Sequence, residues 1–469
     1  MSARLKIILI RWKVVLTLSM CVLFLSNLLF QSAALEAIAV FLLCLMLLFC
    51  LAQIRGVSRI VGYLLFGLSA VLLLWHQAPI AIWMEGINRN LYLIVMFCFT
   101  PLMTIPLRRG GYNEALQHFL ASFLDRKSSF SAFIMSMTAV VGVILNVATV
   151  PLMMTLGSQQ KEKPDNRLLG SSISRGYSLS LFWGPTFAAV ALPLELTGAR
   201  WVDYFPCALT ISLFVLITSY LFNRFQEERK EPTLKHAPKS SLKQKLQTLS
   251  ALDRNKLKEL AIWWIIILGF IVAFSAKTGL NTINVVSIAS LTFPILWMFF
   301  IHRPGDYKDE FLNNYLKNGL PSMNSEIVLF AGAGLTASAF NYSHAADFIP
   351  ALLARVTGGN TLLFIILALF IITGISITGI HVMVPVVVLG STIDPAFYHL
   401  SPLAMTFVLT SGWALSIFLS GSTATALLIG NFLHKDSFTV SIGWNWKYGI
   451  YMFCLFCVFV YGISRLYSI

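Results

Sequence analysis

The chain has 469 residues, of which 57% are hydrophobic and only 12% charged, and its mean hydropathy is +0.77. This composition excludes a soluble globular protein and predicts an all-α polytopic membrane protein. The formal net charge of +14 does not indicate nucleic-acid binding, because the basic residues lie between apolar runs, as the positive-inside rule expects. The seven cysteines lie in or beside apolar segments and indicate no disulfide framework.

Apolar runs of roughly 20 residues mark the expected membrane-spanning helices. The first two, at 14–31 and 34–53, belong to an N-terminal segment, residues 1–57. No small-residue cleavage site follows the first run, so we interpret it as an uncleaved first helix that is followed by a second one.

Residues 58–222 form the next segment of the chain. It begins with expected spans at 58–76 and 90–106, continues with an amphipathic helix at 111–124, and ends with a span at 202–222. The spacing of apolar residues in the amphipathic helix predicts that it lies along the membrane interface.

Two irregular runs lie inside this segment. Residues 129–157 are uncharged and too long for one span, and Asn146 and Pro151 fall in their second half, which predicts a re-entrant hairpin. Residues 170–198 read as a spanning helix that is broken at Gly184-Pro185.

A charged segment, 223–258, follows and reads as a cytoplasmic linker. Residues 259–469 then repeat the earlier pattern. We expect spans, a second interfacial helix, a second hairpin, a second broken helix and a last helix, in that order, at 260–276, 281–301, 325–341, 344–356, 361–390, 402–433 and 446–463.

The two halves share an internal sequence repeat. Gly176–Leu192 matches Gly412–Leu428 at an offset of 236 positions, and Val150-Pro151 falls on Val384-Pro385 at a nearly equal offset. An odd number of expected crossings separates equivalent points, so the repeats have inverted topology. The predicted fold has about 11 transmembrane helices, two re-entrant hairpins and two broken helices.

The charge distribution predicts the orientation of the chain. With a cytoplasmic N-terminus and the C-terminus on the outer side of a plasma (inner) membrane, nearly all Lys and Arg fall on the inner side. The exceptions are Arg89, Arg200, Lys277, Arg355 and Arg465.

Broken helices leave backbone groups unpaired, which a membrane tolerates where those groups line a cavity or bind something. Half-helix N-termini can bind an anion, and carbonyl and hydroxyl oxygens can hold a small cation. The candidate substrate- or ion-binding residues at the breaks and hairpins are Asn146, Thr149, Gly184, Pro185, Thr186, Thr378, Gly379, His381, Ser420, Gly421, Ser422, Thr423 and Thr425. The alternative is that these small residues only allow close helix packing. Arg175 reads as a side chain that extends toward the membrane interface.

The motifs resemble the ion transporter superfamily, in particular its divalent anion sodium symporter and arsenite permease branches. The similarity lies in Asn146–Pro151, Gly176–Thr186, the glycine-rich Glu326–Leu335 and Ser420–Thr425. It implies a dimeric transporter with an elevator movement, small anionic and commonly carboxylate solutes, and Na⁺ or H⁺ coupling. Of the family's Ser-Asn-Thr hairpin signature, this chain keeps only Asn146.

We therefore expect a secondary active transporter of a small, anionic solute, coupled to Na⁺ or H⁺. No enzymatic activity, bound cofactor or metal is expected apart from a transported cation, and the expected partners are the bilayer, the solute and a second copy of the chain. A permease that exports a metalloid or another organic solute is the alternative within transport. The alternatives of other classes are a non-transporting membrane sensor or scaffold, and a membrane enzyme acting on a lipid-linked substrate.

Overall fold

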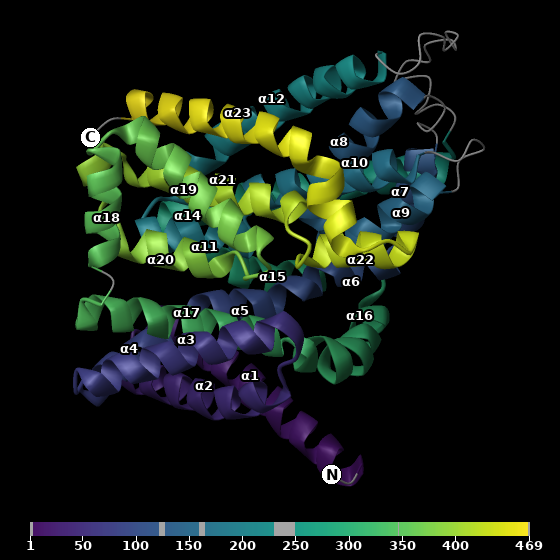
Figure 1. Cartoon of the computed structure of the whole chain (residues 1–469). Helices are drawn as coiled ribbons and strands as arrows, with labels where there is room; N and C mark the ends of the chain where they lie inside the picture. The colour runs from purple at the N-terminus through teal and green to yellow at the C-terminus, as the bar shows by residue number, and fades with distance from the viewer. Residues whose placement is uncertain (1–2, 122–126, 159–164, 229–248, 346, 468–469) are drawn as a thin grey trace. The chain divides into compact units, whose positions relative to one another are not determined.

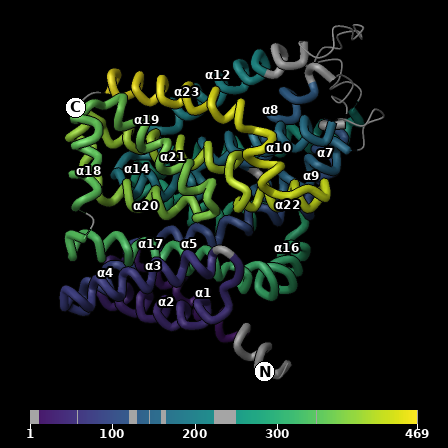
Figure 2. The backbone as a smooth tube through the Cα atoms, in the orientation of Figure 1, coloured from purple at the N-terminus to yellow at the C-terminus, as the bar shows by residue number. Residues whose placement is uncertain are grey.

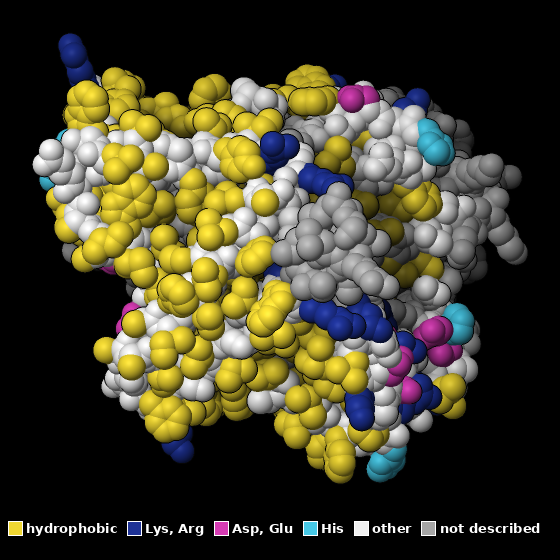
Figure 3. Space-filling view, turned by 90° about the horizontal axis from the view of Figure 1, so that it is seen from below, with side chains coloured by type: hydrophobic (Ala, Val, Ile, Leu, Met, Phe, Trp, Pro, Cys, Tyr) yellow, Lys and Arg dark blue, Asp and Glu magenta, His cyan; other side chains and the backbone are white. Residues whose placement is uncertain are grey.

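The computed structural model describes residues 3–121, 127–158, 165–228, 249–345 and 347–467. Within these ranges the secondary structure is helical, without strands, and ten helical segments are long and apolar enough to cross a membrane. The predicted all-α polytopic membrane protein is therefore confirmed. Figure 3 shows many apolar side chains on the surface of the described residues.

The chain forms two compact units, and each takes segments from both halves of the sequence. Unit 1 comprises Met1–Gly110, Ile267–Gly359 and Met383–Asp394. Unit 2 comprises Gly111–Ile266, Asn360–Val382 and Pro395–Ile469. The units thus do not coincide with the predicted repeats, and helix α14 (Ala251–Thr278) begins in unit 2 and ends in unit 1.

The other helices of unit 1 are α1 (Ala3–Phe30), α2 (Ala33–Gln53), α3 (Gly56–Trp75), α4 (Ile80–Asn88), α5 (Leu91–Phe99), η1 (Thr100–Met103), α6 (Thr104–Arg109), α15 (Thr282–Phe300), α16 (Pro304–Glu310), η3 (Phe311–Gly319), η4 (Leu320–Ser322), α17 (Asn324–Ser343), α18 (Phe348–Thr357) and α20 (Met383–Thr392). Helices α1 and α2 pack side by side (Figure 2).

Helix α17 lies at the centre of unit 1, where it packs against α2, α3, α4, α5 and α20 (Figure 1). It corresponds to the expected span at 325–341, but it is not among the ten segments apolar enough to cross a membrane by composition. Its interior position explains this, because a helix surrounded by protein can carry polar groups. Thr336 Oγ1 lies 2.9 Å from Ser69 Oγ of α3, and both side chains are buried.

Helix α4 is an element that the sequence analysis missed, since the expected span began only at residue 90. Polar residues such as Glu85 and Asn88 made this stretch resemble a loop. Helix α4 packs closely against α17 at Gly86 and Gly334. A Cβ atom at Gly334 would lie only 2.6 Å from the carbonyl oxygen of Gly86, so a larger residue would not fit there. Asn90, at the end of this approach, donates a hydrogen bond to the Phe330 carbonyl oxygen at 3.0 Å.

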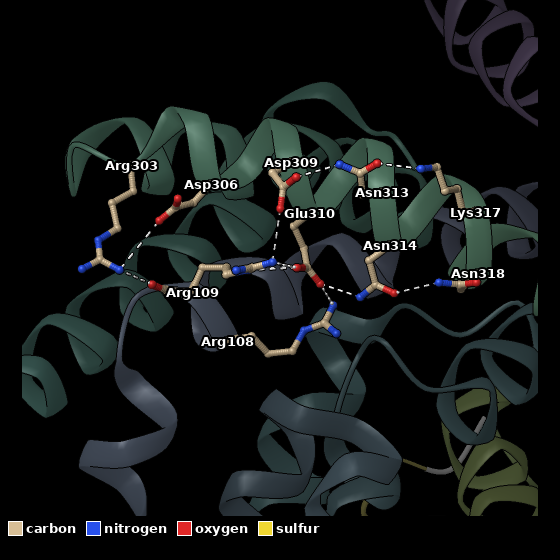
Figure 4. Close-up of polar contacts among 10 residues, drawn as sticks. All are labelled: Arg108, Arg109, Arg303, Asp306, Asp309, Glu310, Asn313, Asn314, Lys317 and Asn318. Atoms are coloured by element: carbon tan, nitrogen blue, oxygen red, sulfur yellow. Dashed lines mark hydrogen bonds and ion pairs between the residues drawn. The ribbon is translucent and has the colours of Figure 1, made fainter.

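Helices α16 and η3 also lay outside the predicted elements, and a buried carboxylate fastens them to α6 (Figure 4). Glu310 Oε2 accepts hydrogen bonds from Arg109 Nε at 2.9 Å and Arg109 Nη2 at 2.7 Å. Its Oε1 lies 3.1 Å from Arg108 Nη2 and also accepts from Asn314. Arg303 Nη1 donates to the Arg109 carbonyl oxygen at 2.7 Å and completes the connection.

Unit 2 contains both broken helices. Its elements, besides the start of α14, are α7 (Tyr112–Ala121), α8 (Lys127–Leu145), η2 (Asn146–Ala148), α9 (Thr149–Ser158), α10 (Asn166–Trp183), α11 (Ala188–Thr197), α12 (Trp201–Glu228), α19 (Thr361–Ile377), η5 (Pro395–Tyr398), α21 (Pro402–Leu419), α22 (Ala424–Leu433), η6 (Thr439–Gly443) and α23 (Trp444–Leu466). Helices α10 and α21 form its core and pack on each other, α10 also against α8 and α21 also against α19.

The remaining predicted elements compare with the structure as follows. The first hairpin contains two helices, α8 and α9, which contact each other and join at η2. In the second, α19 falls in unit 2 and α20 in unit 1. The two amphipathic helices appear as α7 and α18, with residues 122–126 outside the described part. Helix α12 reaches Glu228 and α14 begins at Ala251, so the linker is helical at both ends, and 229–248 lie outside the described residues.

Candidate functional site

The two broken helices stop at the same repeat position and with the same backbone conformation. Gly184 ends α10 with φ −74° and ψ 124°, and Ser420 ends α21 with φ −91° and ψ 131°. The half-helices that follow begin after Phe187, at −101° and 140°, and Thr423, at −73° and 148°. The two breaks thus have the same backbone conformation although their residues differ, and both predicted breaks are confirmed.

The broken helices contact each other at equivalent residues. Ser178 Oγ of α10 donates a hydrogen bond to the Ala414 carbonyl oxygen of α21 at 2.6 Å, and these residues are 236 positions apart. The hydrogen bond therefore joins the two broken helices at matching positions of the repeat inside unit 2.

Glycines at equivalent positions let the broken helices approach the helices beside them. A Cβ atom at Gly176 would clash with the Met135 carbonyl oxygen of α8. A Cβ atom at Gly412 would lie 2.8 Å from the Ile372 side chain of α19. Each broken helix is thus packed in the same manner against the first helix of its own hairpin run.

The turn of the first hairpin is fixed by Asn146, whose φ of 53° lies in the left-handed region. Its Oδ1 accepts hydrogen bonds from Tyr177 Oη at 2.9 Å and from its neighbour's backbone N–H, that of Val147, at 2.7 Å. Its amide nitrogen makes no hydrogen bond to the described residues. Thr149, by contrast, is buried and donates back to the Val141 carbonyl oxygen at 3.2 Å.

The segment after α19 holds the three other predicted hairpin residues. Gly379 has a φ of 100°, which a residue with a side chain rarely adopts. Thr378 is exposed and donates to the Ile375 carbonyl oxygen of its own helix. His381 lies edge-on to the Trp413 ring of α21, with 6.5 Å between ring centroids. Trp413 and Tyr177 hold the same repeat position, so each hairpin run touches an equivalent aromatic side chain of its broken helix.

Hydroxyl groups organise the second break. Ser420 is fully buried, and its Oγ donates to the Ser376 carbonyl oxygen of α19 at 2.6 Å and lies 2.9 Å from Ser422 Oγ. Thr423 Oγ1 caps α22 by accepting from the Ala426 N–H at 3.2 Å and donates to carbonyl oxygens at the end of α21. Gly421 and Thr425 are buried beside these groups.

The first break is less polar. Gly184 and Pro185 are buried and Thr186 is half-buried. Tyr204 Oη of α12 donates to the Phe182 carbonyl oxygen at 2.6 Å, and so pairs a carbonyl group in the last turn of α10. Phe187 supplies no side-chain cap to α11, whereas Thr423 caps α22.

All thirteen predicted site residues belong to unit 2, but they form two groups in which each broken helix contacts its own hairpin run. In the described part of the chain no hydrogen bond joins the residues of one break to those of the other. The sequence analysis missed the residues that connect these groups, namely Tyr177, Ser178, Ser376 and Trp413. The aromatic pair carried a signal, because Tyr177 and Trp413 match at the offset of 236.

Two further findings concern charged groups. Arg175 does not extend to the interface as expected, since it is buried in unit 2 with only 7% of its surface exposed. Among the described residues, no three His, Cys, Asp or Glu side chains converge as a metal site. The oxygen atoms at the breaks are hydroxyl and carbonyl oxygens, which are ligands suited to hard cations.

Comparisons with known proteins identify the fold. No family model and no curated protein matches the chain. The structure is similar to that of Neisseria gonorrhoeae MtrF, described as illuminating a class of antimetabolite efflux pumps, with 14% sequence identity and a TM-score of 0.60 over 87% of this chain and 95% of that one. It is also similar to the YdaH transporter of Alcanivorax borkumensis, described as having an unusual topology, with 14% identity and a TM-score of 0.55 over 80% and 85% of the two chains. The chain therefore shares its fold with membrane transporters, while the resemblance to the symporter and arsenite permease branches stays a prediction.

Proposed function

We propose that this protein is a secondary active transporter of a small, anionic, carboxylate-like solute. The observation that carries the proposal is the pair of broken helices with one backbone shape, which meet at Ser178 and Ala414 in unit 2. Broken helices of this kind form solute and ion sites in transporters, because they present backbone polar groups inside the membrane. The shared fold with MtrF and YdaH supports a membrane transporter in general.

The groups at the breaks favour an anionic solute. Helices α11 and α22 begin at the breaks, and the N–H groups and positive dipole end of a helix N-terminus attract negative charge. The Asn146 amide nitrogen adds a donor at the first hairpin. The Ser420, Ser422 and Thr423 hydroxyl groups use their hydrogens within the break, so their oxygens are suited to hold a coupling cation.

The division into two units supports an elevator-type movement. All candidate site residues lie in unit 2, and unit 1 contains the two N-terminal helices and the α17 core. In an elevator the unit that carries the solute moves while a second unit stays fixed in the membrane. We propose that unit 2 carries the solute, that Na⁺ or H⁺ drives the movement, and that the protein works as a dimer in a plasma (inner) membrane.

A second candidate is the export of an organic solute. It is favoured by the fold shared with MtrF, whose structure is described in terms of antimetabolite efflux pumps. The site would be the same, and the difference would lie in the direction of net transport.

Solute movement in proteoliposomes tests the proposal. Purified full-length protein would be reconstituted, Na⁺ and H⁺ gradients imposed in both directions, and uptake of radiolabelled mono- and dicarboxylates followed. We expect gradient-dependent uptake that falls at least tenfold in the double variant Thr186→Ala, Ser422→Ala. Thr210→Ala is the matched control, since this hydroxyl is exposed on α12 and bonds only within its helix.

Each result separates the candidate functions. Uptake driven by an inward gradient supports a symporter, and movement driven only by an opposing H⁺ gradient supports export. If none of these carboxylates moves under any gradient, the proposal fails in favour of a non-transporting sensor or scaffold, or an enzyme acting on a lipid-linked substrate.

A further inference from the structure

Four buried polar side chains connect α10 with α12 and α23 inside unit 2. We call them the Arg175 clasp, and they are Arg175, Ser219, Asn445 and Tyr448. Arg175 Nε donates to Asn445 Oδ1 at 2.8 Å, and its guanidinium carbon lies 4.1 Å from the centre of the Tyr448 ring. The Tyr448 and Ser219 hydroxyl oxygens are 2.8 Å apart. Each of these side chains is at most 7% exposed.

The orientation of Asn445 is fixed on both sides of its amide group. Its Nδ2 donates to the Val440 carbonyl oxygen at 3.1 Å and to the Ser441 carbonyl oxygen at 3.0 Å, in the π-helical turn η6. With both N–H bonds used, Oδ1 must face Arg175, so the assignment of the amide atoms follows from the hydrogen bonds. A planar guanidinium that stacks on a ring and donates sideways to an amide is a geometry that Lys cannot reproduce.

The clasp lies next to the contacts that build the candidate site. Two positions after Arg175, Tyr177 holds Asn146 at the first hairpin turn, and Ser178 bonds to Ala414 of α21. All three side chains belong to one turn of the continuous helix α10. A rotation or shift of this turn would therefore move the contact to the hairpin and the contact to the second broken helix together.

A charged side chain inside a membrane-spanning helix is costly, and such residues are usually functional. We propose that Arg175 is a positioning residue for the transport site: by fastening α10 to α23, it sets the rotation of α10 that brings Tyr177 to Asn146. This inference rests on the proposed function and adds to it a residue that does not touch the solute.

A double-mutant cycle tests the clasp through transport kinetics. Arg175→Lys keeps the positive charge but loses the stacking and the Nε donor, and Tyr177→Phe removes the hydroxyl that holds Asn146. We expect Arg175→Lys to raise the KM for the solute about three- to tenfold, within the range of coupling through packed networks, with kcat per folded protein within about twofold. If Arg175 acts through Tyr177, the double variant will have nearly the KM of the more impaired single variant.

Arg167→Lys is the matched control. Arg167 lies on the same helix and donates to the same element, through Nη2 to the Trp444 carbonyl oxygen at 3.4 Å, but it is exposed. Arg167→Lys should leave the KM nearly unchanged, and its small effect on the KM should multiply with the effect of Tyr177→Phe in the double variant. Two results would overturn the positioning role: an unchanged KM in Arg175→Lys, or a double variant in which the KM effects of Arg175→Lys and Tyr177→Phe multiply. A purely structural residue lowers the amount of folded protein and leaves the KM of the folded fraction unchanged.

A readout without transport separates this inference from the proposed function. In full-length protein in detergent, Val147→Cys at the hairpin turn would be labelled with a membrane-permeant maleimide, with the wild-type chain as background. Arg175→Lys should speed this labelling severalfold relative to Arg167→Lys, because a released turn opens more often. If the wild-type protein moves no solute, the proposed function fails, and an equal labelling rate in the two variants would independently overturn the clasp.

Discussion

Tyr177 Oη donates a hydrogen bond to Asn146 Oδ1 at 2.9 Å and so joins a broken helix to the turn of a hairpin. The equivalent aromatic residue of the other repeat, Trp413, packs edge-on against His381. The two repeats therefore use the same position for the same purpose, but with different chemistry. A hydroxyl–amide hydrogen bond is directional and fixes the amide group, whereas a ring contact leaves the imidazole nitrogens to other partners.

This asymmetry predicts that removing one hydroxyl group weakens solute binding. In Tyr177→Phe the ring still packs against Phe187, to which it lies edge-on, but the Asn146 amide loses its fixed orientation. A net hydrogen bond contributes about 0.5–1.5 kcal/mol, so we expect the KM to rise about two- to tenfold with a smaller change in kcat. The measurement is initial uptake by proteoliposomes over a range of solute concentrations.

Tyr220→Phe provides the comparison, because Tyr220 lies on α12 and has no hydrogen bond to the described residues. It should leave the KM unchanged. An equal rise in both variants, or none in Tyr177→Phe, would show that the Asn146 turn does not bind solute.

The hydroxyl group of Ser420 should matter for stability more than that of Ser416, one turn earlier. Ser420 Oγ connects α21 to the Ser376 carbonyl oxygen of α19, while Ser416 Oγ bonds to Gly412 within its own helix. Both side chains are fully buried. We expect Ser420→Ala to lower the free energy of unfolding by about 1 kcal/mol and Ser416→Ala by less than about 0.5 kcal/mol.

Thermal unfolding of the two variants in detergent, side by side, checks this difference. Ser420→Ala should also reduce transport, because Ser422 loses the hydroxyl that lies beside its own. Equal midpoints for the two variants would mean that the second break does not depend on its contact with α19.

The breaks were predictable from the sequence because their cause is local and occurs twice. Gly184-Pro185 and Ser420–Thr423 interrupt apolar runs at matching positions with residues that favour the end of a helix. The contacts that surround the breaks were not predictable in this way. Tyr177 and Trp413 match at the repeat offset, but only the packing of each helix shows which neighbour the side chain contacts.

Other elements were missed because hydropathy does not distinguish a loop from a helix that contacts protein. Glu85 and Asn88 lie on helix α4, and the charged residues around Glu310 lie on α16 and η3. Arg175 was assigned to the interface for the same reason, since the sequence shows a charge but not the Asn445 and Tyr448 side chains that receive it. In each of these elements the structure depends on contacts with residues that are far apart in the sequence.

The orientation of the chain in the membrane gives a prediction that is independent of transport. The charge distribution places Lys277 on the outer side and Lys435 on the cytoplasmic side, and both residues are exposed. In intact cells a membrane-impermeant maleimide should label Lys277→Cys and not Lys435→Cys, and both should react after the cells are opened. The wild-type chain supplies the background from native cysteines. The reverse pattern would invert the topology, and labelling of both in intact cells would contradict the number of crossings between them.

The last prediction concerns the dependence of stability on pH through Glu310. Burial by itself would raise the pKa of this carboxyl group, but hydrogen bonds from Asn314 and Arg109 and the charges of Arg108 and Arg109 outweigh burial and lower its pKa. A carboxyl group with a lowered pKa in the folded state stabilises that state fully above the ordinary pKa of Glu, about 4.3, and loses this contribution as the pH falls through the lowered value.

Glu310→Gln should therefore unfold more easily than the wild-type protein at pH 7, by about 1–3 kcal/mol for the lost charged hydrogen bonds, and the difference should shrink below about pH 4. Asp309→Asn is the control. Its side chain is 57% exposed and lies 3.4 Å from Arg109 Nη2, and an exposed pair contributes little, so its effect should stay within about 0.5 kcal/mol. Unfolding in detergent at several pH values measures both variants. A Glu310→Gln difference that is constant from pH 7 to pH 3.5 would contradict the lowered pKa of Glu310, because the protonated carboxyl group would then stabilise the contact as well as the carboxylate does.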